Sequence, residues 1–204
     1  MKKVIILWLW SLLIPILAYP QLIENLEYVS PFNDDVSAVK KNGEWGFINR
    51  EGDVVIAFRD DLFTSKTKEG NYPVFMNGRC KIVKEKNGIT YFGYIDKTGK
   101  TIVEPQFLNA TNFIDGKGIV LKLEKETAGE NRVLGKNVVY YRYYEVVIDI
   151  DGEKLYYLNK KGTNVLLDEK FLQIPPQIRS KFISKNLIAT INEQQRWVIN
   201  RIDN

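Results

Sequence analysis

Histidine is absent from the 204-residue sequence, and cysteine occurs once, at Cys80. Without imidazole the chain lacks the commonest general base, the usual zinc ligand and the serine and cysteine dyads that depend on it. Cys80 has no disulfide partner, and in the stretch RCKIV we expect it to be a small buried hydrophobic residue. Acidic residues do not alternate as in a calcium loop, and glycines stand singly in turns. The sequence therefore predicts no metal and no cofactor.

Carboxylates are the remaining candidates for catalysis. Asp34–Asp35, Asp60–Asp61 and the stretch from Glu124 to Glu130 contain paired acidic residues. Two facing carboxyl groups can cleave a glycosidic bond. Each candidate lies in a predicted turn or polar loop, where acidic side chains are ordinarily solvated. A cell-wall or polysaccharide hydrolase is therefore the alternative interpretation, and we predict no catalytic residues.

A large excess of one charge is also missing. The chain has 29 basic and 25 acidic side chains, a formal net charge of +4, and the two signs are interspersed. Nucleic acids and anionic membranes require a clustered basic surface, so neither is an expected partner. With 45% hydrophobic residues, the chain can bury a sizeable core.

The first twenty residues, MKKVIILWLWSLLIPILAYP, have the order of an export signal. A lysine pair precedes an apolar run from Val4 to Leu17, which is shorter than the about 20 residues that a membrane-spanning helix needs. We expect cleavage near Ala18, a mature chain that begins between Tyr19 and Leu22, and no membrane span afterwards. The protein is then periplasmic or secreted. A retained anchor is the alternative.

The rest of the chain repeats itself. A phenylalanine, a polar turn and an apolar strand recur at Phe32, Phe75, Phe113 and Phe182. After a linker at 21–31, the pattern predicts a repeat domain over 32–204. Its copies lie near 32–74, 75–112 and 113–181, with an insert at 122–147 and a partial copy at 182–204 that lacks a third strand.

Turn residues divide each copy into three strands. Asn42–Gly43, Asn87–Gly88 and Asp151–Gly152 are hairpin signals, because the favoured two-residue turn needs positive φ. A second turn reads NREG, DKTG and NKKG, beginning at Asn49, Asp96 and Asn159. The fold class is therefore all-β, with about three and a half three-stranded antiparallel meanders stacked in one array.

These features resemble the WG repeat, a bacterial β-rich repeat named for its Trp–Gly pair. Trp45–Gly46 matches the pair directly, and Phe92–Gly93 keeps an aromatic residue and the glycine. Leu155–Tyr156 keeps neither, and Trp197 aligns with either position of the pair. The resemblance implies an exported scaffold used for contact and carries no catalytic residues.

Alternation along the aromatic strands places Trp45 and Phe47 on one face, like Phe92 and Tyr94 in the next copy. We interpret this stripe as the core between repeats rather than a row of ligand-binding rings. The glycine beside each ring leaves a gap that we expect a neighbouring ring to cover.

The insert ends in VVYYRYYEVV, which places Tyr140, Arg142 and Tyr144 on one face of a strand. Tyrosine and arginine are enriched at contact hot spots, so these three residues are the candidate partner-binding site. We expect a projecting hairpin anchored by the strand after Asp151–Gly152. The alternative is an extra strand whose tyrosines cover a sheet edge.

The function expected from the sequence is non-catalytic binding in the cell envelope. The partner is another envelope protein or a glycan. A purely structural envelope component is a further alternative, because a repeat scaffold can serve without a ligand.

Overall fold

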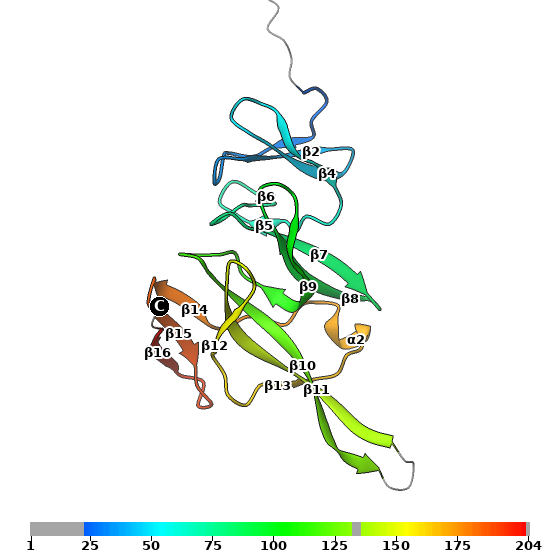
Figure 1. The fold of residues 1–204 in the computed structure, drawn as a ribbon, viewed down its shortest axis with the longest axis vertical. Coiled ribbons are helices and arrows are strands. Elements are labelled where there is room, and N and C mark those ends of the chain that lie inside the picture. Colours follow the sequence, from blue (N-terminus) through cyan, green and yellow to red (C-terminus); the bar gives the residue numbers. More distant parts are fainter. Residues whose placement is uncertain (1–22, 132–135, 203–204) are drawn as a thin grey trace, which may run out of the picture.

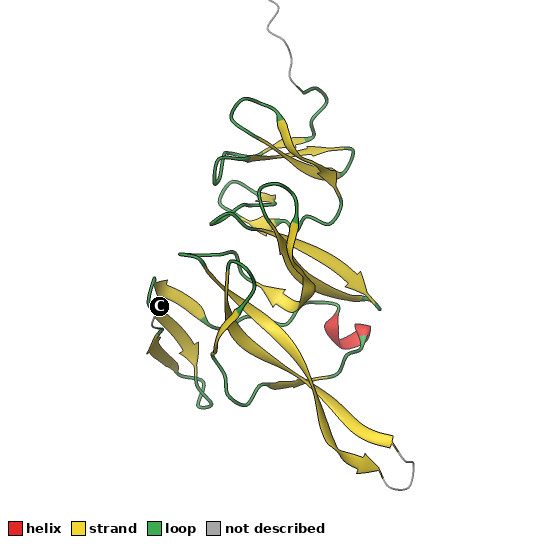
Figure 2. Cartoon of the chain, in the orientation of Figure 1, coloured by secondary structure: helices red, strands yellow, loops and turns green. Residues whose placement is uncertain are grey.

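The computed structural model describes residues 23–131 and 136–202. The molecule is elongated, and successive groups of strands follow one another along its long axis (Figure 1). Among the described residues, almost all regular structure is strand (Figure 2), and the exception there is the short helix α2, Glu169–Leu172. The predicted β-rich repeat fold is confirmed.

Four three-stranded antiparallel meanders make up most of the described residues. The first is β2 (Ser37–Lys41), β3 (Glu44–Ile48) and β4 (Val54–Arg59), and the second is β7 (Cys80–Lys86), β8 (Ile89–Ile95) and β9 (Thr101–Ala110). The third is β10 (Lys117–Asn131), β11 (Lys136–Asp149) and β12 (Lys154–Tyr157), and the fourth is β14 (Lys181–Ser184), β15 (Leu187–Ile191) and β16 (Trp197–Arg201).

Short strands complete these sheets. A small hairpin of β5 (Ser65–Lys66) and β6 (Asn71–Tyr72) links the first two meanders. The second and third meanders form one continuous sheet, because β9 pairs with β10, and β13 (Thr163–Val165) pairs with β11 beside β12. The predicted linker at 21–31 is wrong over β1 (Tyr28–Val29), which pairs with β2 and extends the first sheet.

The second turn of every meander has one hydrogen-bonding pattern. The amides of Gly52, Gly99 and Gly152 donate to the carbonyl oxygens of Asn49, Asp96 and Asp149, and Gln195 does the same to Asn192. The carboxylate or amide oxygen of the first residue also accepts from the backbone, as in the bond from the Asp53 amide to Asn49. A turn residue with these bonds therefore fixes the register of each copy.

This register corrects the alignment of turns and strands that the sequence predicted for the third and fourth copies. The turn at Asp151–Gly152 is the second turn of the third meander, not the first, because β10 and β11 form a lengthened first hairpin that pairs from Lys117 with Asp149 to Asn131 with Lys136. The aromatic–glycine position is therefore held by Glu145–Val146 and Ile188–Ala189, and not by Leu155–Tyr156 or Trp197. The fourth copy does have a third strand, since β16 pairs with β15 along its whole length.

The cores lie between successive meanders, as the aromatic stripe predicted. Phe47 of β3 packs with Cys80, Ile82 and Ile95 of the second meander. Phe92 and Tyr94 of β8 pack with Val120, Val146 and Ile148 of the third. The middle strand therefore uses one face toward the next meander and the other toward the preceding one. Cys80 is buried, as expected, and burial raises the pKa of its thiol to about 12.

The glycine after each aromatic residue is required by the backbone of the third strand. A Cβ added at Gly93 would lie 2.3 Å from the Val103 carbonyl oxygen, and one at Gly46 would lie 2.9 Å from the Ile56 oxygen. The third strand bulges at both places. Val146 and Ala189 occupy the same position, and the pairing has no register shift there. The bulge in the third meander comes later, between Val147 and Ile148. The expectation that a ring fills this gap is wrong for Gly93, whose nearest neighbours are backbone atoms.

Polar contacts repeat along the array as well. The Asp34 side chain accepts from the Gly78 amide of the next meander, and the Asn77 side chain accepts from the Gly116 amide of the one after. Arg59 donates to the Gly99 carbonyl oxygen in a similar link between neighbours. Because these bonds satisfy backbone amide and carbonyl groups of turns in the neighbouring meander, they fix the relative position of adjacent meanders.

Lys81 of β7 carries a buried amine in the second meander, and 8% of the residue is exposed. Its Nζ donates to the Ala110 carbonyl oxygen at 3.3 Å and lies 4.7 Å from the centre of the Phe63 ring. No carboxylate forms an ion pair with it within residues 23–131 and 136–202. Burial lowers the pKa of Lys81 from 10.5 to about 8.

This shift predicts a pH dependence of stability. The folded chain disfavours the ammonium form, so the penalty is complete below the folded pKa of about 8 and disappears as the pH approaches the unfolded value of 10.5. The free energy of unfolding should rise by about 2 kcal/mol between pH 7 and pH 9.5 on account of this group. In guanidinium unfolding, the Lys81→Met variant should lack this rise in the free energy of unfolding. The Lys84→Met variant, which changes an exposed lysine, should retain it. A parent-like pH profile for Lys81→Met would contradict the assignment.

Candidate functional site

The lengthened hairpin β10–β11 projects from the body of the molecule (Figure 1). We call it the arm. As predicted, β11 is anchored to the strand that follows the Asp151–Gly152 turn, because Val146 pairs with Tyr157 of β12. Along β11, the strand alternation places Tyr140, Arg142 and Tyr144 on one face of the arm. The three predicted residues are therefore brought together on one surface.

Glu126 organises this surface from the neighbouring strand. It lies opposite Tyr140 in the pairing of β10 with β11. The hydroxyl groups of Tyr140 and Tyr144 donate to its two carboxylate oxygens at 2.5 and 2.8 Å, and the Arg142 guanidinium lies 3.6 Å from it. Arg142 also stacks over the Tyr140 ring, 5.1 Å from its centre. One carboxylate thus holds all three side chains.

The hydrogen bonds set the charge of the arm face. The Tyr140 hydroxyl, followed by that of Tyr144, lowers the pKa of Glu126 by bonding to its ionised form. The same bond to Glu126 is the main reason that the pKa of Tyr140 is raised. Glu126 is therefore ionised and both tyrosines are neutral donors at physiological pH.

A second tyrosine–carboxylate pair continues the face toward the body. The Tyr157 hydroxyl of β12 donates to Glu124 at 2.5 Å, and this bond is the main cause that lowers the pKa of Glu124. The Tyr157 ring meets that of Tyr144 edge to face at 5.5 Å, and Lys154 lies 4.7 Å over it. The sequence had offered Glu124 and Glu126 only as possible hydrolase carboxylates, and it missed Tyr157 and Lys154. The alternation in KLEKE already places Lys122, Glu124 and Glu126 on one face.

The loop after β12 fixes the base of the arm face. Arg142 Nε donates to the Asn164 side chain on β13 at 2.8 Å. A Cβ at Gly162 would lie 2.7 Å from the Tyr144 ring, so the loop backbone packs directly on that ring. The predicted NKKG turn therefore covers Tyr144 instead of closing a meander. Tyr144 also packs against the core between the second and third meanders, so it has a structural role.

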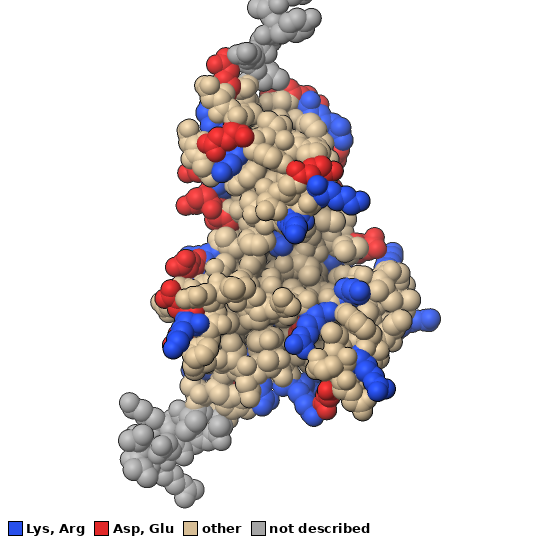
Figure 3. Space-filling view, turned by 180° about the vertical axis from the view of Figure 1, so that it is seen from behind, with Lys and Arg blue, Asp and Glu red and all other residues tan. Residues whose placement is uncertain are grey.

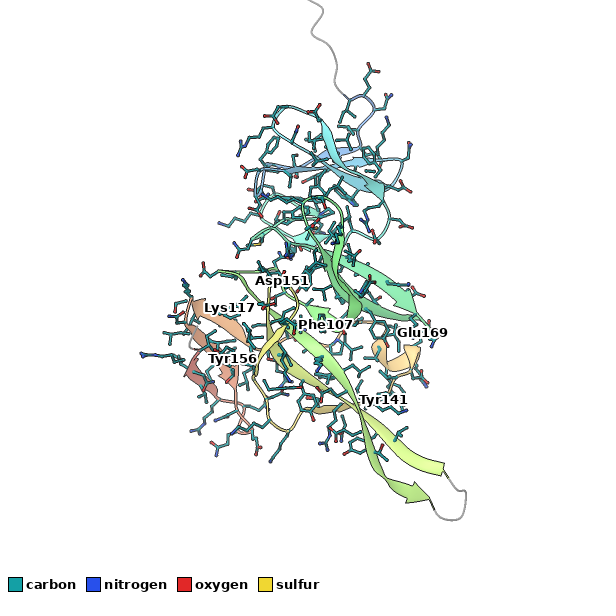
Figure 4. All side chains as sticks on the ribbon, viewed as in Figure 1. Phe107, Lys117, Tyr141, Asp151, Tyr156 and Glu169 are labelled. Atoms are coloured by element: carbon teal, nitrogen blue, oxygen red, sulfur yellow. The ribbon has the colours of Figure 1, made fainter. Side chains whose placement is uncertain are left out.

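The opposite face of β11 is part of a core. Tyr143 packs with Leu121, Leu108 and Leu172 of helix α2, and Tyr141 lies near the base of the arm in Figure 4. The two faces of the arm therefore differ. One is covered by aliphatic packing near the body, whereas the other presents tyrosine rings, carboxylates and an arginine.

Three of the other acidic candidates, Asp34, Asp35 and Asp61, are engaged by basic groups. Asp34 and Asp35 both contact Lys97, and Asp35 also pairs with Arg50. Asp61 forms a two-bond pair with Arg59. Within the described part of the chain, no group of three or more acidic or cysteine side chains is placed to hold a metal ion. Acidic and basic side chains are spread over the face seen in Figure 3.

A family model described as the WG containing repeat matches residues 23–45, 45–80 and 92–125. The chain belongs to the WG-repeat family. The second and third WG matches begin at or beside the aromatic–glycine pairs Trp45–Gly46 and Phe92–Gly93, and each runs on into the first strand of the following meander. The family therefore counts its unit from the middle strand, whereas the structure groups three consecutive strands.

The last WG match stops at residue 125 within β10, part-way along the arm and before the fourth meander. This agrees with the loss of the glycine at Val146 and Ala189, where no bulge needs it. No curated protein and no solved structure matches the chain significantly. None of the helices in the described ranges has the length and apolar character needed to cross a membrane. The predicted signal peptide lies outside the described residues.

Proposed function

We propose that this WG-repeat protein is an exported, non-catalytic binding protein, and that it contacts its partner through the arm face. The observation that carries the proposal is the arm face itself, where Tyr140, Arg142 and Tyr144 converge on Glu126 on a projecting hairpin. We define the arm face by these four residues together with Glu124 and Tyr157. A hairpin that served only to extend a sheet needs no such network.

The network favours binding for an energetic reason. Association is weakened when long side chains must be ordered at the interface. Here Tyr140 and Arg142 are held in place before a partner arrives, by Glu126 and Asn164 respectively. Tyrosine and arginine are also the residues that contribute most at protein contacts. The arm face therefore combines the favoured residue types with a fixed geometry.

The hydrolase alternative is less favoured by the same residues. A glycosidase needs one carboxyl group with a raised pKa to act as the acid. The pKa values of Glu124 and Glu126 are both lowered by hydrogen bonds from tyrosine hydroxyls. Asp34, Asp35 and Asp61 are paired with basic side chains. A purely structural role remains the alternative that the binding experiment tests.

Another envelope protein is the partner that we favour over a glycan. A sugar stacks flat on an accessible ring, but Arg142 already lies over one ring, Tyr140, and the Tyr144 ring is covered by Gly162. Charged groups of both signs remain at the surface and suit a protein with complementary charges.

The double variant Tyr140→Ala/Arg142→Ala tests the arm face. Capture of the partner from envelope extract should fall at least tenfold, because two contact residues are removed, while the thermal unfolding midpoint should change little at these half-exposed positions. Lys125→Ala, an exposed side chain of β10, is the matched control and should retain capture. Parallel binding to purified cell-wall glycan distinguishes the two partner classes. Full capture of both partners by the double variant would refute the proposal.

Export is tested at the N-terminus. We expect mass spectrometry of the protein from its producing cell to find a chain that begins between Tyr19 and Leu22, as the order of basic, apolar and small residues predicts. A membrane-embedded chain that retains Met1 would show that the segment is an anchor.

A further inference from the structure

The fourth meander packs against the third with the opposite sheet face to the one that the second and third meanders turn toward their preceding neighbours. In the second and third meanders, the residue just before the second turn, Ile95 or Ile148, lies in the core shared with the preceding meander. The equivalent residue of the fourth is Ile191, before Asn192. Instead, the core between the third and fourth meanders contains Ile188 and Phe182, on the opposite face of the sheet.

Glu145 holds the chain segment that leads into the fourth meander in this orientation. It occupies the aromatic position of the third copy, and its two carboxylate oxygens accept from the backbone amides of Arg179 and Ser180 at 2.8 and 3.0 Å. These bonds hold the chain that enters β14 against β11. Phe182 and Ile188 then cover Ile119 and Val147 of the third meander.

The reversal exposes a sheet face that is an internal interface elsewhere in the molecule. Trp197 and Ile199 of β16 lie on this face, and they are 53% and 64% exposed. Lys181 of β14 lies 4.9 Å over the Trp197 ring, on the same side. In the second and third meanders, the preceding meander of the same chain covers the equivalent face.

Strand β16 is also an edge of its sheet. It pairs with β15 on one side, and no strand pairs with its other side within residues 23–131 and 136–202. Such an edge presents free backbone donors and acceptors to another strand. Its sequence, WVINR, is self-complementary in the antiparallel direction. When two copies are centred on Ile199, Trp197 lies opposite the partner's Arg201 and Ile199 opposite the partner's Ile199.

We propose that β16 is a dimerisation edge, and that its occupant is β16 of a second copy of this chain. Antiparallel pairing about a two-fold axis joins the two C-terminal sheets into one of six strands. The pairing satisfies the free backbone groups of both edges. It also places the arginine of each copy over the tryptophan of the other, a favourable cation–π contact, and buries the two isoleucines against each other.

Sedimentation velocity over a range of concentrations tests the proposal on the protein purified from its producing cell. The parent chain should change from monomer to dimer as its concentration rises. Ile199→Lys should weaken dimerisation at least tenfold, because two lysines then face each other across the axis. Ile174→Lys is the matched control: Ile174 is 82% exposed outside this sheet, and the variant should still dimerise.

Cross-linking tests the register separately. Ile199→Cys should form a covalent dimer under mild oxidation, since this residue meets its own counterpart, whereas Ile174→Cys should not. The proposal fails if the parent chain stays monomeric at every concentration, if Ile199→Lys dimerises normally, or if Ile199→Cys does not cross-link. It does not depend on the arm, so the Tyr140→Ala/Arg142→Ala variant should dimerise like the parent.

Discussion

Replacing Phe47 by alanine should lower the free energy of unfolding by about 3–5 kcal/mol, the range for removing a large buried aromatic side chain. Phe47 is 1% exposed, and its ring meets that of Phe75 edge to face at 4.8 Å. It packs in the core that joins the first two meanders. The loss should therefore combine lost burial with a cavity that the fixed backbone cannot close. Chemical denaturation followed by circular dichroism measures it.

Trp45→Ala is the matched comparison on the same strand. Trp45 is only half buried and packs on Tyr28 with ring centres 5.6 Å apart. Its replacement should destabilise the protein by about 1–2 kcal/mol, because most of the removed surface is not enclosed. An equal loss for both variants would show that Phe47 and Trp45 do not differ in burial as the structure describes.

Gly93→Ala should be the most damaging single-methyl change in the chain. The added Cβ would lie 2.3 Å from the Val103 carbonyl oxygen and 2.7 Å from the Pro105 nitrogen, and backbone atoms in a paired strand cannot rotate away. The bulge of β9 must open or shift, so we expect a loss of about 3 kcal/mol or more, at the upper end of overpacking effects. The unfolding midpoint of the variant measures the loss.

Gly46→Ala is the matched comparison for Gly93→Ala. Its added Cβ would lie 2.9 Å from the Ile56 oxygen, and the next neighbour, at 3.3 Å, is a side-chain atom of Phe58 instead of backbone. The loss should be smaller than for Gly93→Ala. If Gly93→Ala unfolds at the same denaturant concentration as the parent, the explanation of the aromatic–glycine pair by a bulged third strand is wrong.

The sequence by itself determined the architecture of the first two copies. Asn49 and Asp96 with their glycines specify turns by local hydrogen bonding, and the alternation around Phe47 and Tyr94 specifies which side chains face the core. These signals act over a few residues, so they need no knowledge of the fold. The same alternation placed Tyr140, Arg142 and Tyr144 on one surface of a projecting hairpin.

The later copies were misaligned because their local signals compete. Asp151–Gly152 suits either turn of a meander, and only the pairing of β10 with β11 decides between them. Likewise, Trp197 looked like a repeat tryptophan, but its pairing with Ile191 places it on the third strand of its meander. Long-range pairing is not encoded in a turn dipeptide.

Only the tertiary structure decided which groups meet across strands and which face of a sheet is used. Glu126 became the centre of the arm face because β10 sets it opposite Tyr140. The fourth meander has apolar residues on both faces, so its pattern permits either orientation. The amides of Arg179 and Ser180, 34 and 35 residues away in sequence, donate to the Glu145 carboxylate, and these bonds accompany the orientation that leaves Trp197 and Ile199 exposed.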